Sequence, residues 1–275
     1  MKTAVFLLLF SAQVVAQHHT RLEPATIEVH YRHTMQRDTV RWLATETDSM
    51  ILRIGASASQ FFSRHTFYYD SLWNDPNGRA TAEALTLEAF RTRDYSKEPR
   101  VGTTYDYLYK NYPAGRVTTT NEQFHVACRY DEATPSISWV MADSVRTILG
   151  HPCRMATTDF RGRHWTAWFA TDIPVSDGPW KLGGLPGLIL EAYDEGQQHV
   201  FTAVGLERVK DEPIIFNRSF GDNQKFEQTN RLEFLRSKKK SLMDLNGYIQ
   251  METGIDLSQG KLQKVMRYDL LERDY

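Results

Sequence analysis

The sequence predicts a mainly β (α+β) protein, in which a strongly curved antiparallel sheet or half-barrel packs against one or two helices. Three observations support this fold class. Many short segments alternate apolar and polar residues, as half-buried antiparallel strands do, and turn residues separate them. Only two segments have the composition and apolar spacing of helices. Internal repeats and low-complexity linkers are absent, so residues 17–275 are expected to form a single domain.

The first sixteen residues have the pattern of a secretory signal peptide that is removed from the mature chain. Lys2 gives a positive start, residues 4–10 are apolar, and Val14, Val15 and Ala16 supply small or apolar residues before the cleavage point. The apolar run is too short to span a bilayer, and no later run approaches about 20 apolar residues. We therefore expect an exported protein that begins at Gln17 and has no transmembrane segment in its mature chain.

The strands are expected in order along the chain. Alternation predicts strands over 26–35 and 38–45, and a short apolar run predicts one over 49–55. Further strands are expected near 105–110, 115–120, 124–131 and 136–142. Two hairpins follow. In the first, strands 154–160 and 164–173 flank Arg161-Gly162-Arg163, with Gly162 at a positive φ; in the second, strands 187–194 and 199–209 flank residues 195–197.

Helices are expected over 78–93 and 223–245. The first has strong helix formers and apolar residues at Ala82, Leu85 and Phe90. The second carries an apolar stripe together with a lysine run at 238–240, which is expected to form a solvated face.

Composition and motifs exclude several classes of function. The chain has 33 Lys and Arg against 34 Asp and Glu, a net charge of −1, which argues against nonspecific nucleic-acid binding. The nucleophile elbow G-x-S-x-G and the zinc motif H-E-x-x-H are both absent. No cofactor-binding motif is present, so no cofactor is expected. Both cysteines, Cys128 and Cys153, lie in the mature part, and export with an even count predicts one disulfide between them.

The segment PWKLGGLPGLIL at 179–190 has the glycines of a phosphate-binding loop but not its other requirements. Lys181 precedes the glycines, and neither Ser nor Thr follows them before a strand begins. The segment instead predicts a structural loop, in which Gly183, Gly184 and Gly187 allow positive φ or close approach and Pro186 fixes an extended path. Trp180 and Leu185 are its expected apolar anchors against the open face of the sheet, where the loop plugs or lines an apolar cavity. Lys181 is expected at the surface, with little effect on stability.

The sequence GLPGLIL at 184–190, with WFATDIPVSDGPWKL before it, closely resembles the GLPGLI family of exported Bacteroidetes proteins. Further matching stretches are MILRIGASASQFFS, ILGHPCRMATTDFRGRHWTAWFA and the terminal RYDLLERDY, so the resemblance covers nearly the whole mature chain. The family commonly ends in an Asn-Pro-Ile-Glu-type motif, from which residues 269–272 depart. The resemblance implies export from a Gram-negative cell, to the periplasm or cell envelope, and supplies no catalytic residues.

Several histidines and carboxylates are candidates for metal or acid–base chemistry. After cleavage at Ala16, His18 and His19 lie next to a free amine, which with amides and an imidazole suits Cu(II) or Ni(II). His30 and His33 have odd spacing, so they are expected on opposite faces of one strand and not as joint ligands. A second set, Asp159, Asp172, Asp177 and Glu191, contains carboxylates that could act in pairs as general acid and base.

Aromatic residues favour a binding function over these alternatives. Trp165 and Trp168 have opposite parity in one predicted strand, so one faces the core and the other a cover or a partner. The candidate ligand or partner surface comprises Trp165, Trp168, Trp180, Leu185 and Leu188. The leading hypothesis is a non-catalytic binding or accessory module, similar in architecture to the half-barrels of periplasmic lipoprotein carriers, that holds an apolar ligand or an outer-membrane or other envelope partner. The alternatives are an envelope hydrolase that uses a carboxylate pair and copper or nickel handling through the N-terminal histidines.

Overall fold

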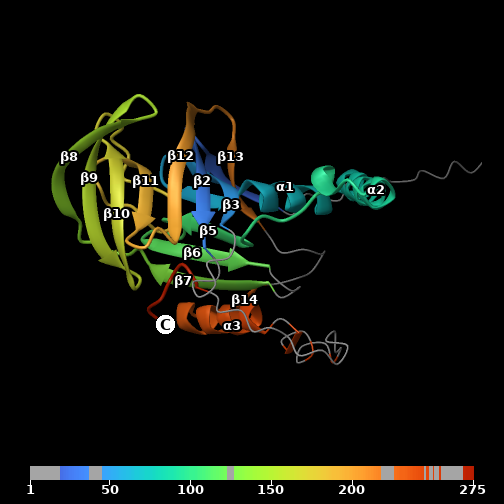
Figure 1. The fold of residues 1–275 in the computed structure, drawn as a ribbon. Coiled ribbons are helices and arrows are strands. Elements are labelled where there is room, and N and C mark those ends of the chain that lie inside the picture. The colour runs from blue at the N-terminus through green and yellow to red at the C-terminus, as the bar shows by residue number, and fades with distance from the viewer. Residues whose placement is uncertain are drawn as a thin grey trace, which may run out of the picture.

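The structure is a computed structural model, which describes residues 19–36, 45–122, 127–217, 226–244, 246–247, 250, 254 and 269–275. Within these residues most elements are strands (Figure 1). In chain order the elements are β1 (His19–Pro24), β2 (Ile27–Met35), β3 (Glu46–Ile54), β4 (Ser59–Ser63), α1 (Arg64–Trp73), α2 (Pro76–Thr92), a 3₁₀ turn (Tyr95–Lys97), β5 (Asp106–Lys110), β6 (Arg116–Asn121), β7 (Cys128–Ala133), β8 (Val140–Ile148), β9 (His151–Phe160), β10 (Arg163–Ala170), β11 (Leu188–Asp194), β12 (His199–Arg208), β13 (Pro213–Asn217), β14 (Glu227–Gln228) and α3 (Arg231–Met243).

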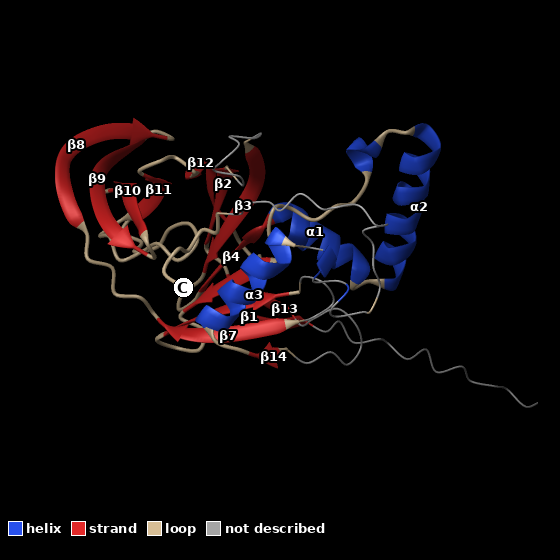
Figure 2. Ribbon diagram, turned by 60° about the horizontal axis from the view of Figure 1, so that its bottom comes forward, coloured by secondary structure: helices blue, strands red, loops and turns tan. Residues whose placement is uncertain are grey.

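Twelve strands form one strongly curved sheet that does not close. Their order is β14-β7-β6-β5-β4-β3-β2-β12-β11-β10-β9-β8, and every neighbouring pair is antiparallel except β14 with β7. The sheet bends round so that β8 to β11 and β5 to β7 lie on two sides of its concave face (Figures 1 and 2). A separate two-stranded sheet consists of β1 and β13. The predicted mainly β class with an open, curved sheet is confirmed.

The main core lies on the concave face of this sheet. It contains Tyr31 from β2, Leu52 from β3, Trp165 from β10 and Phe201 from β12, each no more than 1 % exposed. A second, smaller core packs Phe216 of β13 against Phe62 and Tyr109 of the large sheet. Because β1 and β13 pack in this way, part of the opposite face is also buried.

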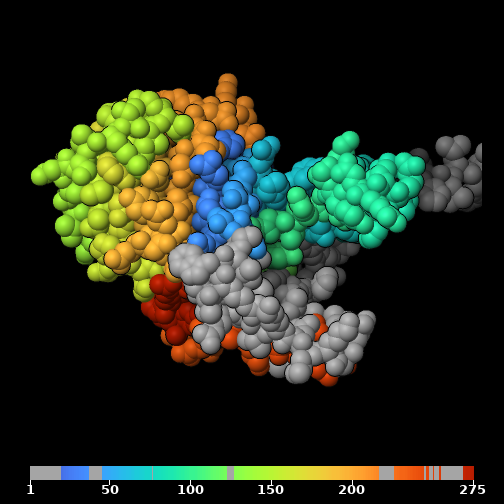
Figure 3. All heavy atoms as spheres, viewed as in Figure 1, coloured from blue at the N-terminus to red at the C-terminus, as the bar shows by residue number. Residues whose placement is uncertain are grey.

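The helices differ from the expectation in number and length. Helix α2 is confirmed, with the Asp75 side chain capping its first turn and proline at its start. Together with α1, which the sequence pattern does not predict, it forms a helical hairpin that projects from the body of the sheet (Figure 3). Helix α3 begins at Arg231, where Asn230 is the N-cap, and not at 223. Its Lys238 is not solvated as expected, because it forms an ion pair with Asp106 at 2.6 Å.

The two predicted hairpins are present. Strands β9 and β10 join through a tight turn in which both Arg161 and Gly162 have positive φ, 54° and 73°. Strands β11 and β12 form the second hairpin. The predicted strand at 38–45 falls almost wholly outside the described residues, as do the signal peptide and His18. His19 is the first residue of β1.

The predicted disulfide is wrong. Cys128 and Cys153 are both free thiols, the first half-buried and the second buried. Cys128 lies on β7 near one edge of the large sheet and Cys153 on β9 near the other, with eight strands between β7 and β9 in the sheet order. A disulfide requires the two cysteines to lie close together in the fold. An even cysteine count carries no information about this, because it does not depend on the order of the strands in the sheet.

Among the described helices none is both long and apolar enough to cross a membrane.

Candidate functional site

The glycine- and proline-rich loop runs from the end of β10 back to the start of β11 across the concave face. Trp180 and Leu185 are 5 % and 2 % exposed and belong to the main core. Gly184 has a φ of +85°, which favours glycine. At Gly187 a Cβ atom would lie 2.0 Å from the carbonyl oxygen of Ala170, so only a glycine lets the two backbones approach so closely. Pro186 is exposed and Gly183 has room for a side chain.

Lys110 fixes the position of the loop through three hydrogen bonds. Its ammonium group donates hydrogen bonds to Asp177 Oδ1 at 2.6 Å and to the carbonyl oxygens of Gly178 and Leu182 at 2.6 and 3.0 Å. The Trp139 indole donates to the carbonyl oxygen of Gly183 at 2.9 Å. The loop thus divides the concave face into two spaces, which both contact Lys181: an open groove of about 540 Å³ beside Lys110 and a smaller cavity beside Trp180.

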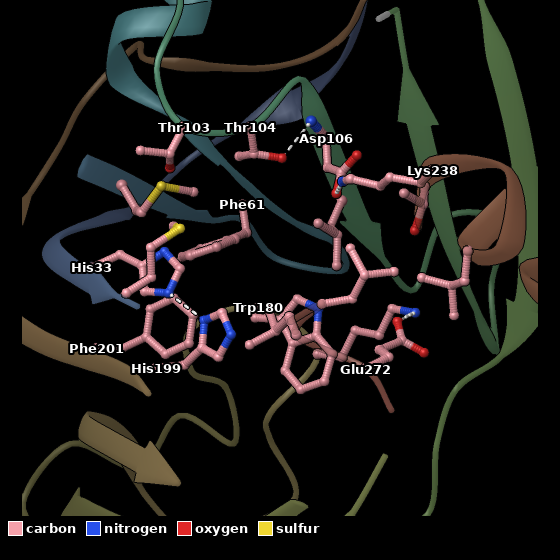
Figure 4. A pocket seen from close by; sticks show the side chains of 18 of the residues that line it. His33, Phe61, Thr103, Thr104, Asp106, Trp180, His199, Phe201, Lys238 and Glu272 are labelled. Atoms are coloured by element: carbon pink, nitrogen blue, oxygen red, sulfur yellow. Dashed lines mark hydrogen bonds and ion pairs between the residues drawn. The ribbon is translucent and has the colours of Figure 1, made fainter. Parts of the chain in front are cut away.

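The smaller cavity has the stronger features of a binding site. Its volume is about 100 Å³. Phe61 from β4, Phe201 from β12 and Trp180 from the loop form an aromatic wall (Figure 4). Two methionines, Met35 and Met50, add flexible apolar surface, and α3 covers one side with Phe234 and Leu235. The cavity is therefore assembled from one helix and from several strands and loops that are distant in the sequence.

A buried histidine pair lies in this wall. His33 Nε2 and His199 Nδ1 are 3.2 Å apart, so one ring donates a hydrogen bond to the other, and the His33 ring stacks on Phe201 with 4.0 Å between centroids. Burial lowers the pKa of His33 to about 3. Burial also lowers the pKa of His199 well below its ordinary value, with further lowering by His33, Arg163 and Arg273. Both rings are neutral at neutral pH.

Lys181 is not the surface residue that the sequence suggested. It is 4 % exposed, and its ammonium group contacts Glu132, Glu272 at 2.5 Å and the Tyr130 hydroxyl at 3.1 Å. Burial lowers the pKa of this ammonium, but Tyr130, Glu272 and Glu132 outweigh it and raise the pKa overall. The sequence signal for this role is the position of Lys181 between Trp180 and Leu182, in a segment rich in large apolar residues.

Residues 269–275, to which sequence reasoning assigned no role, close the cavity. Leu270 and Glu272 are 5 % and 3 % exposed, and both line it. The buried guanidinium of Arg163 holds this segment, since it pairs with Asp269 at 2.9 Å and donates to the carbonyl oxygens of Leu270 and Leu271 at 2.6 and 2.8 Å. Arg163 also pairs with Asp194 at 2.6 Å. Arg163 at the start of β10 and Lys181 in the loop after it therefore fix the segment that covers the cavity.

The charged groups that line the cavity all have partners. Lys238 of α3 pairs with Asp106 of β5 at 2.6 Å, and Glu272 pairs with Lys181 and with Arg231 at 2.6 Å. Asp269 pairs with Arg163 and Arg273, which contribute to a pKa below its ordinary value although burial raises it. Among the described lining residues, no charge is left for a charged ligand to neutralise.

The four carboxylates considered for acid–base chemistry are not brought together as a pair. Each contacts a different basic side chain: Asp159 contacts His164, Asp172 contacts His151, Asp177 contacts Lys110 and Glu191 contacts Arg146.

The aromatic candidates divide between the two faces of β10. Trp165 is fully buried on the concave side, with its ring centroid 5.7 Å from that of Trp180. Trp168 has the opposite parity, and the guanidinium of Arg146 covers its ring at 4.0 Å. Leu188 is fully buried in the main core. Of the five predicted surface residues, only Trp180 lines the cavity.

Comparison with known proteins gives little beyond this geometry. A family model described as a protein of unknown function (Porph_ging) matches residues 161–191, which span the β9–β10 turn, β10, the loop and the start of β11. No curated protein matches the chain. Two solved structures of PNGF-II, in the P21 and C2 space groups, share 14 % and 13 % sequence identity over 78 % of this chain, with TM-scores of 0.48 and 0.49. The chain spans about a third of the length of these structures.

Proposed function

We propose that this protein is a non-catalytic binding protein of the cell envelope, which holds a small, uncharged, apolar molecule in the cavity between Trp180, Phe201 and α3. The observation that carries the proposal is the aromatic cavity in which every described charged lining residue already has a partner of opposite charge. Transfer of a charged ligand into such a site would cost its hydration energy without a compensating partner, whereas an apolar ligand loses only unfavourable contact with water.

The size of the cavity limits the ligand, or the part of it that is buried. The volume of about 100 Å³ is somewhat smaller than the roughly 150 Å³ of an apolar cavity that accepts benzene. A single small ring or a short branched alkyl group therefore fits with little rearrangement of the walls. A longer ligand would have to displace residues 269–272 or α3.

A sequence pattern at the start of the chain supports the location that we propose. The first sixteen residues have the signal-peptide pattern, and residues 161–191 match a family model within the region that resembles the GLPGLI family. We propose that the whole mature chain belongs to that family and acts in the periplasm or cell envelope.

Toluene is a suitable probe because it is uncharged and has one ring. Isothermal titration of toluene into the purified protein should show saturable binding to one site. Leu235→Trp, on the cavity side of α3, should weaken this binding by more than about 10-fold because the larger ring fills the space. Leu232→Trp is the matched control, since Leu232 is on the same helix but is exposed. Absence of saturable binding, or equal binding by both variants, would contradict the proposal.

A further inference from the structure

A β-bulge in β12 changes which way its later side chains face. In the pairing of β12 with β2, the register shifts between Ala203 and Gly205. Ala203 and Leu206 both pack against the concave core, which a regular strand could not achieve because their parity differs. The bulge therefore places Glu207 on the convex face, opposite Glu28 of β2. Bulges that redirect a side chain in this way are common beside functional sites.

Three potential metal ligands converge on that convex face. His30 lies two residues after Glu28 and so shares its face, and its Nε2 atom is 3.1 Å from Glu28 Oε1 and 3.1 Å from Glu207 Oε1. The three ligand atoms lie within 4.8 Å of one another. Bond lengths of about 2.0–2.2 Å to nitrogen and oxygen put the ligands of a tetrahedral zinc ion about 3.4 Å apart, so only a small adjustment is needed.

The carboxylate of Glu28 is held in place by a second layer of contacts. Its other oxygen, Oε2, accepts a hydrogen bond from Arg53 Nε at 2.7 Å. Arg53 is itself buried, and it contacts Glu212 at 3.0 Å and donates to the Pro213 carbonyl oxygen at 3.0 Å. Oriented metal-ligand carboxylates commonly have such outer partners. Glu28 Oε1 is thereby directed at His30 by buried structure, and not by a flexible surface contact.

Without a cation this arrangement leaves an electrostatic mismatch. His30 Nε2 carries at most one proton, and two carboxylate oxygens lie at the same distance from it. The two carboxylates repel each other at this separation, and Arg53 contacts only the far oxygen of one of them. A divalent cation between the three atoms would satisfy both carboxylates and the imidazole lone pair.

We propose that Glu28, His30 and Glu207 form a binding site for a divalent transition metal ion of the Zn²⁺ class on the convex face of the sheet. Mixed imidazole and carboxylate ligands suit zinc, and three protein ligands leave a coordination position open. The site is independent of the apolar cavity, because His33 faces the cavity while His30 faces away from it.

The test uses Zn²⁺ as the probe. The chelator-treated protein should bind one Zn²⁺ at this site in isothermal titration, and Zn²⁺ should raise the unfolding temperature. His30→Gln should lower the affinity by more than about 10-fold and abolish the thermal shift. Glu207→Gln should act in the same direction and should leave the fold intact, because the Glu207 side chain is 59 % exposed. Unfolding curves recorded without metal check that both variants are folded.

Two controls identify the site. His164→Gln should keep full affinity, because His164 is also a half-exposed strand histidine but contacts a single carboxylate, that of Asp159 at 2.8 Å. The double variant His18→Ala/His19→Ala separates this site from the N-terminal histidines. No stoichiometric Zn²⁺ binding by the wild type, unchanged affinity in His30→Gln, or loss of affinity only in the N-terminal variant would each overturn the proposal.

Discussion

Replacement of Lys181 by methionine tests how much the buried charge cluster contributes to stability. Methionine keeps most of the aliphatic length of lysine but removes the ammonium group that contacts Glu132 and Glu272. In the wild type, Lys181, Arg161 and Arg231 face Glu132, Glu272 and Asp274, so three positive groups balance three negative groups. The variant leaves the buried cluster with one more negative than positive charge.

The expected loss of stability follows from the burial of these groups. Removal of one partner from a buried ion pair typically costs about 3–5 kcal/mol. Arg231 remains 2.6 Å from Glu272 and Arg161 remains in contact with Glu132, so the cost should lie near the lower end, at about 3 kcal/mol. For a chain of this size, that corresponds to a decrease of roughly 8 °C in the unfolding temperature.

Urea unfolding of the wild type and the variant, followed by tryptophan fluorescence, measures the difference. Lys210→Met is the matched control, because Lys210 is exposed after the end of β12 and should change stability by less than about 0.5 kcal/mol. A double-mutant cycle with Glu272→Gln should give a coupling energy of more than about 1 kcal/mol. If Lys181→Met and Lys210→Met unfold with equal stability, the cluster does not stabilise the fold and the reasoning fails.

Three further predictions concern the loop and two buried titrating groups. Gly187→Ala should lower the free energy of unfolding in urea by more than about 2 kcal/mol, and Gly183→Ala by less than about 1 kcal/mol. The reason is that only at Gly187 would the added Cβ lie 2.0 Å from a backbone oxygen, and equal losses in the two variants would contradict this. Burial lowers the pKa of His33 to about 3, so stability is full above about pH 6.5 and falls as the pH decreases. The decrease in the free energy of unfolding between pH 7 and pH 5 should be about 2 kcal/mol smaller in His33→Gln than in the wild type. Parallel curves of stability against pH for the two proteins would refute this. Burial raises the pKa of Asp70 to about 7 despite its hydrogen bond from Tyr107, so stability falls as the pH rises from about 4 to 7. Asp70→Asn should therefore be more stabilising at pH 8 than at pH 4 in the same assay. A difference between variant and wild type that does not depend on pH would count against this.

Local patterns were enough to predict most of the sheet. The alternation on either side of Arg161-Gly162-Arg163 predicts the β9–β10 hairpin because strand period and turn chemistry are both local properties. Helix α1 was not predicted, because RHTFYYDSLW is rich in aromatic residues with low helix propensity. Its stability comes from the Ser63 cap and from packing against β3 and β4, which a local pattern does not contain.

The candidate site was less predictable for a related reason. The odd spacing of His30 and His33 predicted opposite faces, and it is confirmed, but the partners of each histidine come from β12, far away in the sequence. Lys181 and the two cysteines were assigned by general rules for lysines at surfaces and cysteines in exported chains. Tertiary structure overrides both rules, because it brings Glu132 and Glu272 to the lysine and places Cys128 and Cys153 on strands near opposite edges of the sheet.

The position of residues 269–272 in the fold affects the order in which the protein can form. Arg163 is synthesised 106 residues before Asp269, and Lys181 is synthesised 91 residues before Glu272. In a nascent chain that has already paired β9, β10 and β11, Arg163 and Lys181 therefore lack the carboxylates of Asp269 and Glu272 that neutralise part of their charge. Folding during synthesis should stop at a loosely packed sheet, and the aromatic cavity should become dry only after residue 272 has been added. Proteolysis of stalled nascent chains of increasing length would then show resistance that rises in one late step, and not strand by strand.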